Sequence, residues 1–97
     1  GRAIDNLPED SIVELPIRVN AQGVSPEKIG PLPEAHAALC RLQMSIQELL
    51  VQAYREKSKK LLLQALMIDP IVNNAAKAEA MMEKMLQAEA DYLPELR

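Results

Sequence analysis

The sequence predicts an α+β fold in which short antiparallel strands are followed by three helices. Five of the seven prolines and all three glycines lie in residues 1–33, whereas residues 34–69 contain neither. Apolar residues also alternate with polar ones before residue 33, and recur every three or four positions after it. Residues 1–97 are therefore expected to form a single C-terminal domain fragment, with an extended part over 1–33 and a helical part over 34–97.

Residues 12–19 are predicted to form the main strand, because their side chains alternate between apolar and polar types. Pro16 falls on the polar face and has no N–H to donate, which predicts an edge strand or a bulge at that point. The apolar face of this predicted strand consists of Val13, Leu15, Ile17 and Val19.

Two turns flank this predicted strand. Leu7-Pro8-Glu9-Asp10 has a proline where a tight turn needs a fixed φ, so residues 3–7 are expected to run back against the main strand as a hairpin. Asn20-Ala21-Gln22-Gly23 predicts a second turn, which returns the chain through residues 24–29. Two or three strands of this length need a further surface for stability.

A long helix is predicted after Pro33, with an apolar stripe along one face. The stripe consists of Ala35, Leu39, Leu42, Ile46, Leu49 and Ala53. A second helix is expected to begin at Ser58, which can cap it, and to end at Asp69-Pro70. Apolar side chains lie nearly all round this second helix, so it is expected to be covered on several sides.

A third helix is predicted to begin near Asn73 or Asn74 and to run to Tyr92, where Leu93-Pro94 ends it. Its inner face is expected to consist of Ala78, Met81, Met82, Met85 and Ala88. Phe and Trp are absent and only two tyrosines are present, so the core is expected to be aliphatic and rich in methionine.

Charge and composition exclude several kinds of partner. Acidic residues outnumber basic ones by 14 to 11, and the net charge is −3, which argues against a nucleic-acid ligand. No segment approaches the roughly 18 consecutive apolar residues of a membrane span, so no membrane partner is expected. The single cysteine, Cys40, cannot form an intramolecular disulfide, which favours the cytoplasm. Because the chain opens with glycine, we expect it to be part of a longer protein.

The sequence contains no complete active site. The three glycines are too scattered to form a turn that receives a dinucleotide or a phosphate, so no cofactor-binding residue is assigned. His36 and Cys40 lie four residues apart on the first predicted helix and could give a metal ion two ligands. An exposed histidine beside a half-buried thiol is the simpler interpretation. No catalytic or metal-binding residue is therefore assigned.

Glu14 is the one charged residue within the apolar stretch Ile12-Val13-Glu14-Leu15-Pro16. A carboxylate held among apolar neighbours could serve as an acid or a base. The alternation of side chains favours the alternative, in which Glu14 points to the solvent face of the strand.

Several segments along the sequence together resemble a known family. Residues 3–16, then Gly23, Pro26, Gly30 and Leu32-Pro33, have the order and spacing seen in the C-terminal part of the family 4 glycoside hydrolases. The resemblance continues through residues 37–41, 48–53 and 64–70, and closes with 90–95, so it covers nearly the whole chain. Asn6-Leu7-Pro8 and Met67-Ile68-Asp69-Pro70 look more like the branch acting on unphosphorylated α-glycosides, such as α-galactosidases, α-glucosidases and α-galacturonidases.

The resemblance implies a glycosidase that depends on NAD and Mn²⁺ and departs from the usual mechanism with two carboxylates. Such enzymes oxidise the sugar at C3, remove the C2 proton, eliminate the aglycone, add water and reduce the ketone again. The family's nucleotide motif, metal ligands and base lie upstream of the matched region, so this chain alone is expected to be inactive and to bind neither cofactor. Many members have asparagine where this chain has Cys40.

The family fold resembles the lactate and malate dehydrogenases, so the chain is expected to form the tail of such a C-terminal domain. Its expected partners are the upstream nucleotide-binding domain of the same protein, a second copy in a homo-oligomer, and the sugar substrate of the full-length form. Asn6 and Glu14 are expected to support the substrate pocket without taking part in the chemistry. The alternative is a stand-alone helical dimerisation or protein-interaction module, whose contact surface would be the stripe from Ala35 to Ala53.

Overall fold

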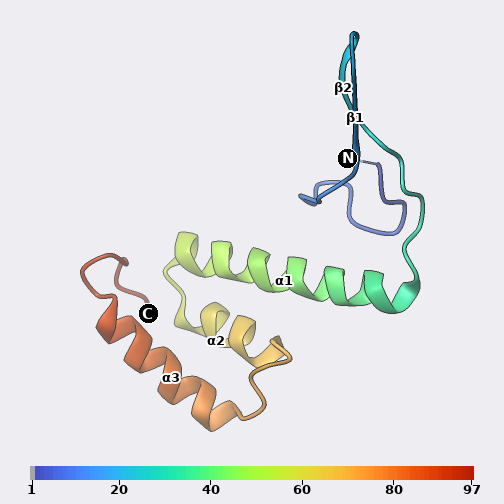
Figure 1. Cartoon of the computed structure of the whole chain (residues 1–97). Coiled ribbons are helices and arrows are strands. Elements are labelled where there is room, and N and C mark those ends of the chain that lie inside the picture. Colours follow the sequence, from blue (N-terminus) through green and yellow to red (C-terminus); the bar gives the residue numbers. More distant parts are fainter. Residues whose placement is uncertain (1) are drawn as a thin grey trace. The chain divides into compact units, whose positions relative to one another are not determined.

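A computed structural model describes residues 2–97 and shows an α+β fold, which confirms the predicted class (Figure 1). The elements are β1 (Ile17–Asn20), β2 (Gly23–Pro26), α1 (Glu34–Glu56), α2 (Lys59–Ile68) and α3 (Ala75–Ala88). The chain divides into two compact units, the first ending at Arg41 and the second comprising Leu42–Arg97. The boundary between them falls inside α1.

β1 and β2 form an antiparallel hairpin, as the turn at Asn20–Gly23 predicts (Figure 1). Asn20 pairs with Gly23, which leaves a loop of two residues, and the Asn20 side-chain oxygen accepts a hydrogen bond from the Gln22 N–H at 2.9 Å. Gly23 has a φ of +124°, a conformation that side chains with a Cβ rarely adopt. The turn therefore requires glycine at position 23, and Asn20 adds one exposed hydrogen bond to it.

The predicted strand over residues 12–19 is too long, because β1 includes only Ile17–Asn20. Residues 11–16 belong to no strand or helix, although their exposure still alternates: Val13 and Leu15 are half-buried, while Ile12 and Glu14 are exposed. A ladder needs a neighbouring strand, and β2 is only four residues long. The alternating pattern correctly predicts which side chains in residues 11–16 are more buried, but it does not show whether another strand lies beside them.

The predicted hairpin between residues 3–7 and the main strand is wrong. Ile4 instead forms a parallel bridge with Gly30, next to the start of α1. The Pro8 carbonyl does accept a hydrogen bond from the Ser11 N–H at 3.1 Å, so the chain turns there as expected. The turn, however, does not return the chain along β1, and the Ala3 carbonyl and the Asp5 N–H are paired with residues 29–30 instead.

α1 begins directly after Pro33, whose carbonyl accepts hydrogen bonds from the N–H groups of His36 and Ala37. At its other end, Ser58 N–H donates to the Ala53 carbonyl and Lys57 N–H to the Tyr54 carbonyl. This pair of bonds is the Schellman ending of a helix. Lys57 takes the left-handed position with a φ of 52°, where glycine is usual.

The apolar stripe predicted on α1 is right in the second half of the helix and wrong in the first. Ile46 and Ala53 are buried, but Ala35 is exposed and Leu39 is 61% exposed. Ala37 is buried instead. Within the first unit, the helix face that bears Arg41 lies against the segment around Asn6, so tertiary contacts choose the buried face there.

α2 has the predicted bounds, because Ser58 caps it and Asp69 follows its last residue before Pro70. The Ser58 hydroxyl accepts a hydrogen bond from the Leu61 N–H at 3.3 Å. Asn74 caps α3 in the same way through the Lys77 N–H at 3.0 Å, which resolves the choice between Asn73 and Asn74. α3 ends at Ala88 and not at Tyr92, since residues 89–92 form turns.

α2 packs against α3 in the second unit, and small or flexible side chains fill their contact. Ala65, Ala78 and Met82 are buried, as an aliphatic, methionine-containing core predicts. Met81, Met85 and Ala88 were expected on the inner face of α3 but are exposed. Only one narrow face of the helix is covered, because α2 is its one packed helical neighbour among the described residues.

Two further contacts tie the second unit together. The Lys59 ammonium lies 3.0 Å from a Glu83 carboxylate oxygen, which links α2 to α3. The Arg97 N–H donates to the Lys57 carbonyl at 2.7 Å, and the Lys59 N–H donates to the Arg97 carbonyl at 2.9 Å. The end of the chain is thereby fastened to the connection between α1 and α2. Among the described residues, no helix is long and apolar enough to cross a membrane.

Candidate functional site

The candidate site is built on two segments of the first unit that pair in parallel. The Ala3 carbonyl accepts hydrogen bonds from the N–H groups of Ile29 at 2.8 Å and Gly30 at 3.2 Å. The Asp5 N–H donates to the Gly30 carbonyl at 3.1 Å. Gly30 has a φ of +79°, which a residue with a Cβ would adopt only with strain. Residues 3–5 are thus fixed alongside the chain that leads into α1.

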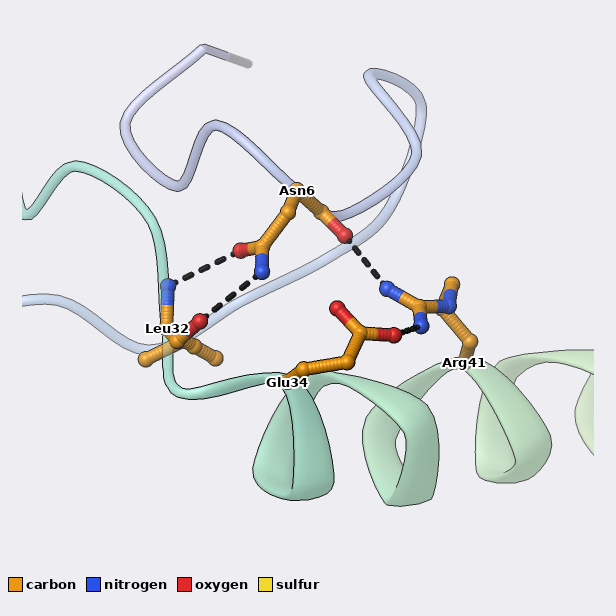
Figure 2. A network of polar contacts seen from close by, with 4 residues as sticks. All are labelled: Asn6, Leu32, Glu34 and Arg41. Atoms are coloured by element: carbon orange, nitrogen blue, oxygen red, sulfur yellow. Dashed lines mark hydrogen bonds and ion pairs between the residues drawn. The ribbon is translucent and has the colours of Figure 1, made fainter.

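Asn6 extends this pairing with its side chain. Its Nδ2 donates to the Leu32 carbonyl at 2.8 Å, and its Oδ1 accepts from the Leu32 N–H at 2.9 Å (Figure 2). An amide side chain has one donor and one acceptor group with the spacing of a peptide unit, so it replaces a strand neighbour here. Both backbone groups of Leu32 are satisfied, and the residues before α1 are held in one conformation.

Arg41 connects the same segment to α1. Its Nη1 donates to the Asn6 carbonyl at 2.9 Å, and its Nη2 forms an ion pair with Glu34, the first residue of α1 (Figure 2). Arg41 is half-buried while Glu34 is exposed. A planar guanidinium with several donors suits this double role, because it can bind a carbonyl and a carboxylate in fixed directions. We call Asn6, Leu32, Glu34 and Arg41 the Asn6 network.

The chemistry of the Asn6 network is that of positioning. An amide does not exchange protons near neutral pH, and a guanidinium stays charged in proteins. None of the buried side-chain nitrogen and oxygen atoms in the described part of the chain lacks a hydrogen-bond partner. The network therefore fixes the residues before α1 and the start of α1, and its one titratable group is the exposed Glu34 carboxylate, which is paired with Arg41.

Asn6 was predicted from the sequence as a supporting residue, whereas Arg41 was not assigned a role. The available signal was its spacing: Arg41 lies seven residues after Glu34, so two helical turns bring the two side chains to one face of α1. The other partner of Arg41, the Asn6 carbonyl, lies 35 residues away in the sequence. A contact of that range leaves no trace in a local pattern.

Glu14 lies apart from this network, and its position agrees with the solvent-facing alternative. It is exposed, and it forms no hydrogen bond or ion pair with the residues described. A role near a substrate pocket would need residues from outside this 97-residue chain.

His36 and Cys40 both lie in the first two turns of α1, the former exposed and the latter half-buried. Among residues 2–97, no group of three or more His, Cys, Asp or Glu side chains is placed to hold a metal ion. The glycines at positions 23 and 30 lie in a hairpin turn and before α1, and neither begins a phosphate-binding loop between a strand and a helix. This part of the chain does not fit manganese or NAD on its own.

The second unit contains an apolar cavity of about 170 Å³, where the residues after α3 pass over the helices. Its lining comprises Leu50, Ala53, Tyr54, Leu62, Leu86, Leu93, Pro94 and Leu96. These residues carry no charged side chain, and the Tyr54 hydroxyl is the one polar side-chain group among them.

Residues 1–72 match the family model described as the C-terminal domain of family 4 glycosyl hydrolases. The chain belongs to this family, as its sequence resemblance predicts.

Individual relatives agree with this assignment. The chain is 36% identical over 94 residues to a maltose-6′-phosphate glucosidase of Bacillus subtilis, which covers 97% of this chain and 21% of that protein. It is 30% identical to an α-galactosidase of the same organism, with 97% of this chain and 22% of that protein covered. The chain thus spans about a fifth of the length of these relatives.

Solved structures show the same relation in three dimensions. A 6-phospho-α-glucosidase from gut microorganisms, in complex with NAD and Mn²⁺, superimposes with a TM-score of 0.85 at 32% identity. A second such structure, with NAD and glucose 6-phosphate, gives a TM-score of 0.84 at 33% identity. Each match covers 98% of this chain and 22% of the other. The α+β fold of the described residues therefore matches that of a family 4 C-terminal domain.

Proposed function

We propose that this chain is the C-terminal part of a longer glycosidase that uses NAD and Mn²⁺ to hydrolyse α-glycosides by oxidation, elimination, addition and reduction. The observation that carries the proposal is the structural match, which includes nearly all of this chain but only 22% of an enzyme solved with NAD and Mn²⁺. An upstream nucleotide-binding domain would supply both cofactor sites. When bound, NAD would supply hydride transfer and Mn²⁺ would stabilise the negative charge on substrate oxygens.

The proposed substrate class is an α-glucoside phosphorylated at O6. The sequence resemblance favours the branch that acts on unphosphorylated sugars. Several relatives, however, are named for 6-phospho sugars, including those at 36% and 34% identity. An α-galactosidase at 30% identity represents the other branch. The names of the relatives support the phosphorylated class, so we do not retain the branch that the resemblance favours.

The role proposed for this chain is to brace the substrate pocket and the surfaces between domains. Asn6 supports it through the Leu32 backbone, and Glu14 contributes from its exposed position to a surface formed with upstream residues. The proposal includes a homo-oligomer, since many large apolar side chains in the described part are exposed, Ile71, Tyr92 and Leu39 among them. It also includes a cytoplasmic location, which a single free cysteine favours.

The test uses the longer protein encoded with this chain. With NAD and Mn²⁺ present, it should release 4-nitrophenol from 4-nitrophenyl α-glucoside 6-phosphate, and a chelator should abolish the release. The unphosphorylated 4-nitrophenyl α-glucoside is the matched control, with an expected kcat/KM at least about 100-fold lower, because an unfilled phosphate site loses several charge-assisted hydrogen bonds. Equal or higher activity on the control would assign the enzyme to the other branch.

The 97-residue chain alone is the second arm of this test. Calorimetric titration with NAD or Mn²⁺ should show no micromolar binding, because the described residues contain neither a phosphate-binding turn nor three clustered metal ligands. Micromolar binding of either cofactor would contradict the assignment of both sites to the upstream part.

A further inference from the structure

The segment Ile12–Leu15 combines the side-chain pattern of a strand with a backbone that has no partner in the described chain. Half-buried Val13 and Leu15 alternate with exposed Ile12 and Glu14. The backbone hydrogen bonds stop on either side of this segment: the Ser11 N–H donates to the Pro8 carbonyl, and the Pro16 carbonyl accepts from the Glu27 N–H at the base of the hairpin. Between them, none of the four residues forms a hydrogen bond with residues 2–97.

The adjoining hairpin also has an uncovered apolar face. Ile17 pairs with Pro26 and Val19 pairs with Val24, so these four side chains point to the same side of the sheet. Ile17, Val19 and Val24 are 58%, 67% and 66% exposed, and Ile12 is 99% exposed. A hairpin of two four-residue strands is at best marginally stable by itself. The unpaired backbone and the uncovered side chains therefore both indicate a missing neighbour.

We propose that residues 12–15 become a β-strand when a strand from the upstream part of the same polypeptide pairs with them, and that this part also covers the apolar face of the hairpin. The proposal rests on the proposed function, because it needs an upstream part. In the solved relatives the matched region is only 22% of the chain, so most of such a polypeptide lies outside the residues described here. Strand addition would satisfy the backbone of residues 12–15 and bury the side chains beside it.

The small size of the apolar face favours the same polypeptide over a second copy. Stable dimers bury about 1,200–2,000 Å² in total, whereas three or four aliphatic side chains at these exposures offer only a few hundred Å² per copy. A contact within one polypeptide is formed at a high effective concentration and does not need the full area. A second copy is therefore the alternative that the experiment has to exclude.

The experiment is amide hydrogen exchange, resolved to single residues, on the longer protein. A strand presents alternate N–H groups to a neighbour on one side, so either the amides of Ile12 and Glu14 or those of Val13 and Leu15 should exchange at least about 100-fold more slowly than in an unstructured peptide. Exchange of all four amides at the unstructured rate would overturn the proposal.

Two controls separate the possible outcomes. Slow exchange should persist on 100-fold dilution, with the oligomeric mass followed by light scattering; slow exchange that disappears as the oligomer dissociates would identify a second copy as the partner and overturn the proposal. Glycosidase activity is assayed on the same sample. Slow exchange without activity would contradict the proposed function alone, whereas activity without slow exchange would contradict the added strand alone.

Discussion

The two compact units of the chain use different interactions to maintain their structure. In the first, which ends at Arg41, Ala37 is the one fully buried apolar residue among those described, and directed hydrogen bonds from Asn6 and Arg41 hold the backbone. The second unit, Leu42–Arg97, is built on apolar contacts between helices. Its buried residues are Ile46, Ala53, Ala65, Ala78 and Met82.

This difference determines how each unit should respond to substitution. Apolar packing is distributed over many atoms, but removing a large group from it or adding a charge to it is costly. A polar network depends on a few bonds, each of which contributes about 0.5–1.5 kcal/mol net. Substitutions in the helical core should therefore have the largest effects, the Asn6 network intermediate ones, and the ends of helices the smallest.

Ala65→Asp should have the largest effect. Ala65 is 1% exposed on α2, in the unit where α2 packs against α3, so the new carboxylate would be buried without a partner. We expect a loss of about 3–5 kcal/mol, enough to unfold a chain of this size. The measurement is helical circular dichroism at 222 nm in a urea titration.

The control for this substitution is Gln64→Asp, one residue earlier on α2 and exposed. It places the same charge on the same helix and should change the stability by about 0.5 kcal/mol or less. Equal losses for the two variants would show that α2 is not packed as described.

Met82→Ala should have the next largest effect. Met82 is buried at 4% exposure on α3, and its truncation should cost about 2–5 kcal/mol through lost contacts and a cavity. Met85→Ala on the same helix is the matched control, since Met85 is exposed and should cost less than about 1 kcal/mol. Urea unfolding of both variants measures the difference. A larger loss of stability for Met85→Ala than for Met82→Ala would show that Met85 is buried, as the sequence predicts for the inner face of α3.

The same contrast explains which features could be predicted from the sequence. Ser58, Asn74 and the Asp69-Pro70 ending act on their own helices through bonds three or four residues long, so the bounds of α2 and the start of α3 were predicted correctly. The pairing of Ile4 with Gly30 and the bond from Arg41 to Asn6 join residues 26 and 35 positions apart. Patterns of period 2 or 3.6 report which face is apolar, but they do not identify the segment that covers it.

Asn6→Ala should have an intermediate effect, located in the first unit. The substitution removes both hydrogen bonds to Leu32 and leaves the part-buried Leu32 N–H and carbonyl without a partner in the protein. The expected loss of stability is about 1–3 kcal/mol. Amide exchange should report it as faster exchange at Leu32 and Asp5, while the amides of α3 keep their rates. Loss of protection throughout the chain would show that the two units unfold together.

Asn20→Ala is the matched control for Asn6. Asn20 also accepts a hydrogen bond from a backbone N–H, that of Gln22, but in the exposed hairpin turn. Water can replace this bond, so the substitution should cost less than about 1 kcal/mol and leave the Leu32 amide protected. A larger effect at Asn20 than at Asn6 would contradict the role of the Asn6 network.

Lys57→Gly should have the smallest effect, and it is expected to be stabilising. Lys57 ends α1 with a φ of 52°, a conformation that costs a residue with a Cβ roughly 1–2 kcal/mol. Glycine removes this strain but loses more entropy on folding, so the net gain should be about 0.5–1 kcal/mol. The hydrogen bonds that Lys57 forms at this helix end involve only its backbone, so the substitution preserves them.

Lys60→Gly, inside the first turns of α2, is the control for Lys57→Gly and should destabilise the chain by up to about 1 kcal/mol. Only at Lys57 does glycine relieve backbone strain, so only Lys57→Gly should raise the urea midpoint. A lower midpoint for both glycine variants would contradict the left-handed ending of α1.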